Sequence, residues 1–74
     1  MAIGPKQRRA LEAVAAGAVK HAHPFTWALE ADWLDVKPTT LQRLAQAKLI
    51  RVQANADDYW RPVVVTDAGR GALA

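Results

Sequence analysis

The side chains best suited to chemistry form a polar row at helical spacing between residues 37 and 46. At 100° per residue, a helix over this segment would carry one outward row, flanked by Lys37 and Thr40 and made of Thr39, Gln42, Arg43 and Gln46. An arginine can pair with the two acceptors of guanine, a glutamine with adenine, and a threonine with a phosphate or a thymine methyl group. The row therefore has the chemistry of base and phosphate recognition. The same residue types are also ordinary on a solvated helix face.

Residues for covalent or metal chemistry are scarce. The sequence contains no cysteine and no serine, which excludes a thiolate nucleophile, a disulfide and a zinc–thiolate site. Covalent catalysis would have to start from threonine, lysine, aspartate or glutamate, and none of these has an obvious activating partner nearby in the sequence. His21 and His23 could form half of a metal site with Glu30 or Asp32, but such a pair without a third ligand at a defined spacing is more often accidental. We expect no enzyme, no cofactor and no bound metal.

Length and composition limit the chain to one small domain, residues 1–74. A chain of 74 residues has room for a single core. Its net charge of +3 favours a polyanionic partner without settling the matter. No apolar run approaches the roughly 20 residues of a membrane span, and the N-terminal segment reaches charged residues without an apolar signal core. We therefore expect a cytoplasmic protein with no membrane partner, and no small-molecule ligand is evident.

Helical patterns occupy the first part of the chain. Pro5 suits the first position of a helix that runs to Ala16 or Val19, with Gly17 as its cap or as a weak point inside it. Its predicted apolar stripe consists of Leu11, Val14, Ala15 and Ala18. Residues 20–25 are predicted to form a connection, because Pro24 disfavours helical geometry at His23.

Two further helices are predicted after this connection. Thr26 would cap a helix over 27–34, in which tryptophans pack against the first and third helices and the apolar stripe is Trp27, Ala28, Ala31 and Leu34. Pro38 would begin the third helix, over 38–48, and Leu41 and Leu44 would face inward.

The hydrophobic period changes to two after Leu49. Alternation predicts a half-buried strand over 50–54, a turn over 55–58 and a second strand over 59–66. Thr66 or Asp67 could then cap a short helix over 68–73. The expected fold class is α+β, with three helices, a two-stranded β-hairpin and a short C-terminal helix.

Two arginines and two aromatic residues lie around this predicted hairpin. Arg51 and Arg61 could reach phosphates or a minor groove, whereas Asp57 and Asp58 at the turn would repel a phosphate backbone. Strand alternation places Tyr59 and Trp60 on opposite faces, so at least one of these aromatic rings should be partly exposed.

Three stretches together resemble the winged helix-turn-helix domains of bacterial repressors. The segment Thr26–Leu41 resembles a threonine-capped helix, a turn and the start of a recognition helix. The segment Leu44–Arg51 is similar to the join between the recognition helix and the wing. The segment Val65–Leu73, read as V-T-D-A-G-R-G-A-L, resembles the start of the post-wing helix in the multiple-antibiotic-resistance regulator group.

The resemblance implies a DNA-binding protein, a small bacterial or phage transcriptional regulator whose partner is double-stranded DNA. The third helix would lie in the major groove with the hairpin wing alongside, so the implied DNA contacts are Lys37, Thr39, Thr40, Gln42, Arg43, Gln46, Arg51 and Arg61. The sequence departs from the family at Lys48 and Asp35, where glycines are usual, and it ends at Ala74 without the family's long dimerisation helices. A lysine at position 48 would have to adopt a left-handed conformation, or the helix would have to end differently.

A protein-interaction module of the same fold is the alternative hypothesis. Such a module, for instance a phage-type inhibitor or adaptor, would use the wing with Tyr59 and Trp60 as contacts. A protein partner or a homodimer is therefore possible beside DNA.

Overall fold

The computed structural model describes residues 3–22, 26–53 and 59–74, which form an α+β fold. Its elements in chain order are α1 (Pro5–Ala15), β1 (Val19–Ala22), β2 (Thr26–Leu29), the 3-10 turn η1 (Ala31–Trp33), α2 (Pro38–Gln46), β3 (Ile50–Val52), β4 (Arg61–Val65) and α3 (Asp67–Leu73). The four strands form one antiparallel sheet in the order β2-β1-β4-β3.

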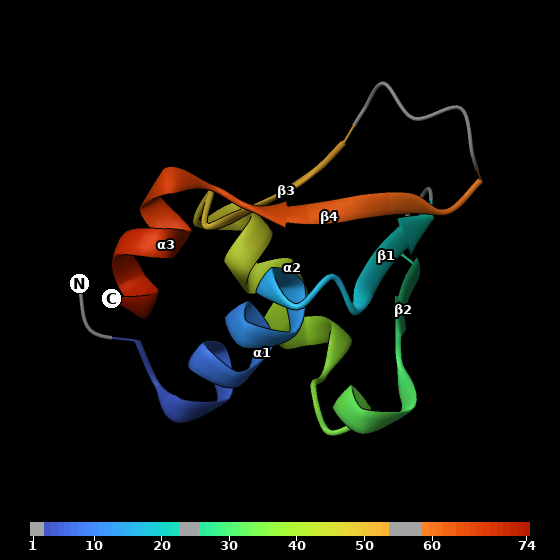
Figure 1. Cartoon of the computed structure of the whole chain (residues 1–74), viewed down its shortest axis with the longest axis horizontal. Helices are drawn as coiled ribbons and strands as arrows, with labels where there is room; N and C mark the ends of the chain where they lie inside the picture. The colour runs from blue at the N-terminus through green and yellow to red at the C-terminus, as the bar shows by residue number, and fades with distance from the viewer. Residues whose placement is uncertain (1–2, 23–25, 54–58) are drawn as a thin grey trace.

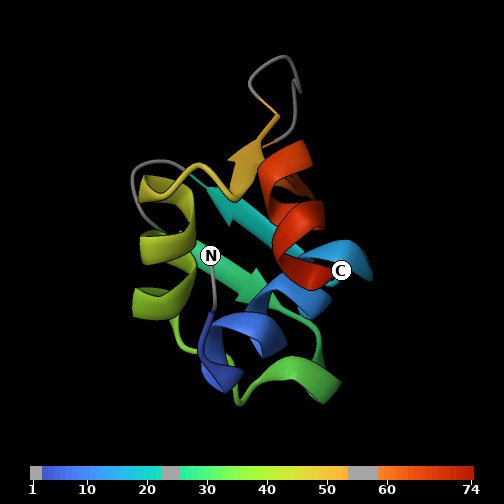
Figure 2. The same cartoon turned by 90° about the vertical axis from the view of Figure 1, so that its left-hand side faces the viewer.

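The sheet and the helices form two layers. Figure 1 shows α1 and α2 beneath the sheet, with α3 at one end of β4, and Figure 2 shows α2 and α3 on opposite sides of α1. The sheet consists of two strand pairs, β1–β2 and β3–β4, which are joined where β1 pairs with β4. This pairing sets Lys20 opposite Pro62 and His21 opposite Arg61. All described helices therefore lie on one face of the sheet.

The core lies between this covered face and the helices. Leu11 of α1, Leu41 and Leu44 of α2, and Val19 of β1 are its largest fully buried side chains. Ile50 and Val63 join them from β3 and β4. Because successive strand residues point to opposite faces, the neighbours of these core residues on the strands point away from the helices.

Helices α1 and α2 end in the same hydrogen-bond pattern, known as the Schellman motif. In α1, the N–H of Gly17 donates to the Val14 oxygen and the N–H of Ala18 to the Ala13 oxygen. In α2, Lys48 takes the place of the glycine, with φ of 63° against 75° for Gly17. Of the two alternatives at Lys48, the structure shows the left-handed conformation.

Helix α3 begins at a threonine that also holds the end of α2. The Thr66 hydroxyl accepts a hydrogen bond from the N–H of Gly69 and donates one to the Lys48 oxygen. The N–H of Thr66 donates to the Leu49 oxygen. A Cβ at Gly69 would overlap this oxygen, so the close approach of α3 requires a glycine there.

The helix predicted over 27–34 is wrong. Residues 26–29 form strand β2, and only Ala31–Trp33 make a single turn of 3-10 helix. The apolar residues of so short a segment fit both the helical and the strand period. Pairing with β1 supplies hydrogen-bond partners for its main chain and directs Trp27 and Leu29 toward the core. Leu34, which the helical stripe would bury, is 68% exposed.

Two related predictions also need correction. The sheet has four strands where a two-stranded hairpin was expected, because part of the predicted connection forms β1. Helix α1 ends at Ala15, which is exposed, although the stripe placed Ala15 inside. The predictions of α2, β3, β4 and α3 are confirmed to within a few residues, whereas the predicted turn over 55–58 lies outside the described residues.

Candidate nucleic-acid interface

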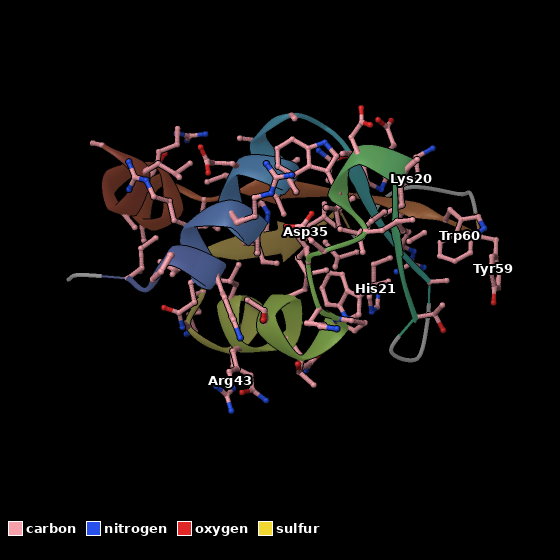
Figure 3. The ribbon with its side chains drawn as sticks, turned by 90° about the horizontal axis from the view of Figure 1, so that it is seen from below. Lys20, His21, Asp35, Arg43, Tyr59 and Trp60 are labelled. Carbon is pink, nitrogen blue, oxygen red and sulfur yellow. The ribbon has the colours of Figure 1, made fainter. Side chains whose placement is uncertain are left out.

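The exposed side of α2 carries the polar row found in the sequence. Thr39, Arg43 and Gln46 are exposed and Gln42 is half-buried, while Leu41 and Leu44 fix the opposite side of the helix in the core. Figure 3 shows Arg43 projecting away from the body of the molecule. The structure therefore brings these four polar residues onto one surface.

Cations stand at both ends of α2. Lys37 is its N-cap residue and Pro38 its first residue, and the first turn contains no acidic side chain. Lys48 is exposed just beyond the last turn. Neither lysine lies within salt-bridge distance of a carboxylate among the described residues. This surface has a positive charge at each end and no negative charge on the helix itself.

Thr40 faces the first turn of α1 instead of joining the outward row. It lines two adjoining grooves of about 370 and 320 Å³ between the helices. Lys6 lines both grooves, Lys37 borders the first and Arg43 the second. The N-terminal turn of α1 thus adds Lys6 to the positive surface of α2.

The acidic group nearest to this surface is neutralised by an arginine of α1. The Arg9 guanidinium donates to both carboxylate oxygens of Asp35, at 3.1 and 3.3 Å, and to the main-chain oxygen of Asp32. It also lies 4.1 Å from the centre of the Trp33 ring, a cation–π contact. This hydrogen bond lowers the pKa of Asp35 and raises that of Arg9, and partial desolvation opposes both shifts. Asp35 therefore stays charged and paired.

Arg8 and Arg9 both make hydrogen bonds to other elements of the fold. Arg8 donates to the main-chain oxygens of Ala72 and Leu73 at the end of α3. Lys6 is thus the basic residue of this turn whose side chain makes neither a hydrogen bond nor an ion pair among the described residues.

On its other flank, α2 adjoins an aromatic pair of the first hairpin. Trp27 lines an open groove of about 360 Å³ with Pro38, Thr39 and Gln42. Its ring packs edge-to-face against His21, with ring centroids 4.5 Å apart. Because Trp27 was expected on a helix, its position beside the polar row was not predicted.

Arg51 and Arg61 lie on opposite faces of the sheet. Arg51 pairs with Val64 and points to the same face as Val64. Arg61 is two residues from Val63 on β4, so it points to the opposite face, on which Val63 is buried. Arg61 therefore projects on the same side as α2, next to His21. Arg51 projects on the far side, so the structure does not gather all eight predicted contacts on one surface.

Neither a metal cluster nor a membrane-spanning helix occurs in the described parts of the chain. No three histidine, aspartate or glutamate side chains there come close enough to hold an ion. His23, the second member of the histidine pair, lies outside the described residues. Within the described ranges, every helix is too short or too polar to cross a bilayer.

Comparison with known proteins adds no relative from which a role could be carried over. No protein-family model, no curated protein and no solved structure matches this chain.

Proposed function

We propose that this protein binds double-stranded DNA by placing α2 in the major groove, as a small transcriptional regulator of winged-helix type would. The observation that carries the proposal is the charge pattern around α2. Its exposed face has cations at both ends, amide and hydroxyl side chains between them, and no carboxylate of its own. The nearby Asp35 is paired with Arg9, so it opposes a phosphate backbone less than a free carboxylate would.

The dimensions of α2 suit this role. Its nine residues span roughly 14 Å, and the major groove is about 12 Å wide and admits one helix. Arg43, Gln42 and Gln46 would reach base edges, because they lie on the exposed side. Lys6, Lys37 and Lys48 would contact phosphates on either side of the groove. Arg61 projects on the same side of the sheet and completes the proposed contacts.

The chain order supports a winged-helix relationship in part. Helix α1, strand β1, helix α2 and the hairpin β3–β4 follow one another as in that fold, and β1 pairs with the second strand of the hairpin. The segment over 26–33 differs, since a strand and one 3-10 turn stand where the first helix of the helix-turn-helix would be. We therefore base the proposal on the surface of α2 and only secondarily on the fold. A cytoplasmic location would follow from this role.

Fluorescence anisotropy with labelled random duplex DNA tests the proposal. Three or four phosphate contacts predict a loss of affinity of roughly 40-fold to 150-fold between 50 and 200 mM salt. Arg43→Ala combined with Gln46→Ala should abolish sequence preference and weaken binding. The matched control is Arg70→Ala, which also removes an exposed arginine from a helix but lies on α3. Absence of duplex binding at low salt by the folded protein would refute the proposal.

A protein-interaction module remains the second candidate function, because two aromatic rings are exposed beside β4. Tyr59 is 71% and Trp60 37% exposed. Exposed aromatic residues are frequent contact points between proteins. If this candidate is correct, Trp60→Ala should release a protein partner while duplex affinity stays unchanged. Retention of that partner by the variant would exclude Trp60 as its contact.

A further inference from the structure

The face of the sheet that points away from the helices is uncovered by any described element. We call it the open face, and its strand residues are Lys20 and Ala22 of β1, Thr26 and Ala28 of β2, Arg51 of β3, and Pro62 and Val64 of β4. Ala22 is fully buried although it lies outside the core cluster, so the exposed part of this face comprises the other residues. Figure 1 shows the helices on the other side of the sheet.

Trp60 extends this face at one end. Trp60 directly precedes β4, in a bend, and a one-step continuation of the β1–β4 register would set it opposite Ala22, in line with Pro62 and Val64. Its ring packs against Tyr59 at 90°, with ring centroids 5.5 Å apart, and both rings keep exposed surface. Figure 3 shows Lys20, Tyr59 and Trp60 toward the same end of the molecule. An aromatic platform therefore adjoins a cation on the open face.

The charged side chains within these strands are both positive. Lys20 on β1 lies opposite Pro62 and Arg51 on β3 lies opposite Val64, on either side of β4, so the two positions are about 12 Å apart. Both are exposed, and no described carboxylate lies within salt-bridge distance of either. Glu30 directly follows β2 and lines a groove of about 240 Å³ with Lys20 and Ala28, so one carboxylate borders this face at the end away from Trp60. Pro62 and Val64 of β4, which lie between the cations, carry no charge.

We infer that the open face binds a single strand of nucleic acid, with a base stacked on Trp60 and phosphates held by Lys20 and Arg51. Exposed aromatic rings next to cations form the surfaces on which single strands bind without sequence preference. A second copy of this chain is a poor occupant, because two open faces would bring like charges together. An acidic protein would also satisfy the cations, and it is a separate outcome of the test below. This site is separate from the duplex surface of α2.

Anisotropy titrations with a labelled 15-nucleotide oligothymidine test the inference. Trp60→Leu, which keeps an apolar side chain without an aromatic ring, should weaken binding by about fivefold to a hundredfold. Trp60→Phe should retain most of the affinity. Lys20→Ala with Arg51→Ala should lower the slope of log affinity against log salt by about 1.4. Far-ultraviolet circular dichroism verifies that each exposed-residue variant is folded.

Parallel titrations with duplex DNA separate this inference from the proposed function. The pair Arg43→Ala and Gln46→Ala should leave oligothymidine affinity unchanged and reduce duplex affinity, and the open-face variants should do the reverse. Duplex binding without oligothymidine binding would overturn the inference and leave the proposed function standing. Oligothymidine binding that is equal in wild type and Trp60→Leu would also overturn it. If labelled poly-glutamate binds wild type and oligothymidine does not, the face takes an acidic protein and the inference is wrong.

Discussion

The hydroxyl of Thr66 lies 2.7 Å from the main-chain oxygen of Lys48 and donates a hydrogen bond to it. Among the described residues other than glycine, Lys48 alone has a left-handed backbone conformation. Helix α2, which carries the candidate contacts, is therefore held at its C-terminal end by Thr66, the N-cap residue of α3. Loss of this hydrogen bond should therefore lower the free energy of unfolding and also shift α2.

Replacing Lys48 by glycine should stabilise the fold and weaken duplex binding. A left-handed residue with a Cβ costs about 1–2 kcal/mol, and the greater freedom of glycine in the unfolded chain offsets part of this. We expect a net gain of about 0.5–1 kcal/mol in the free energy of unfolding, measured by urea denaturation. The slope of log duplex affinity against log salt should become shallower by about 0.9 for the lost phosphate contact.

The equivalent position of α1 supplies the control for this variant. Gly17→Lys should destabilise the protein by about 1 kcal/mol, since Gly17 has the same left-handed backbone. If both substitutions leave the stability unchanged, backbone strain at Lys48 is not significant.

Removal of the Thr66 hydroxyl should destabilise α3 and loosen its contact with α2. Thr66→Val deletes the acceptor of the Gly69 N–H and the donor to the Lys48 oxygen. Loss of an N-cap hydroxyl costs about 0.5–2 kcal/mol, and we expect the upper half of this range because two hydrogen bonds are lost. Thr66→Ser keeps the hydroxyl and should retain most of the stability. Equal thermal midpoints for the two variants would contradict the assignment.

The glycines of α3 should respond differently to alanine. Gly69→Ala places a methyl group against the Leu49 oxygen and within 2.6 Å of the Val65 Cγ1 atom, so it should cost about 1–3 kcal/mol. Gly71 has no atom within 4 Å of the corresponding position. Gly71→Ala should therefore be neutral or stabilise the helix by up to about 1 kcal/mol. Chemical denaturation of both variants tests the contrast.

The pairing of Arg9 with Asp35 should make stability depend on acid pH. The pKa of Asp35 is lowered in the folded protein, so the unfolded chain binds its proton more readily. The stabilisation is present above the ordinary pKa of an aspartate and is lost as the pH falls through the lower pKa of the folded state. Asp35→Asn should remove this part of the pH dependence, measured as the difference in thermal midpoint from wild type.

A double-mutant cycle identifies the partner in this effect. Arg9→Ala should remove the same part of the pH dependence, and the double variant should show no further loss. If Asp35→Asn and wild type follow parallel curves from pH 7 into the acid range, the ion pair does not contribute to stability.

The sequence predicted the elements that carry strong local signals. Pro5 and Pro38 mark helix starts and Thr66 a cap, and the structure places α1, α2 and α3 at these residues. The segment over 26–34 also has a candidate cap, Thr26, but its apolar residues satisfy helical and strand spacing equally, and Thr26 lies in strand β2. Its state is decided by pairing with β1, a tertiary contact that a local pattern does not contain.

The candidate site was predictable where it lies on one helix and unpredictable where it depends on register. The outward row of α2 follows from the helical period alone. Which face Arg51 and Arg61 occupy depends on the pairing of Arg51 with Val64, and a slip of one residue would place both on the same face. The open face likewise needs the pairing of β1 with β4, which joins residues far apart in the sequence.

The short β1–β4 contact also determines how this fold should open. Each hairpin closes locally, but β1 and β4 share only two residue pairs in the described chain, at Lys20 with Pro62 and His21 with Arg61. Proline has no amide proton, so this seam has fewer main-chain hydrogen bonds than a longer ladder would. Amides along the seam should therefore exchange with solvent before those of α2, and the two hairpins should separate as intact units.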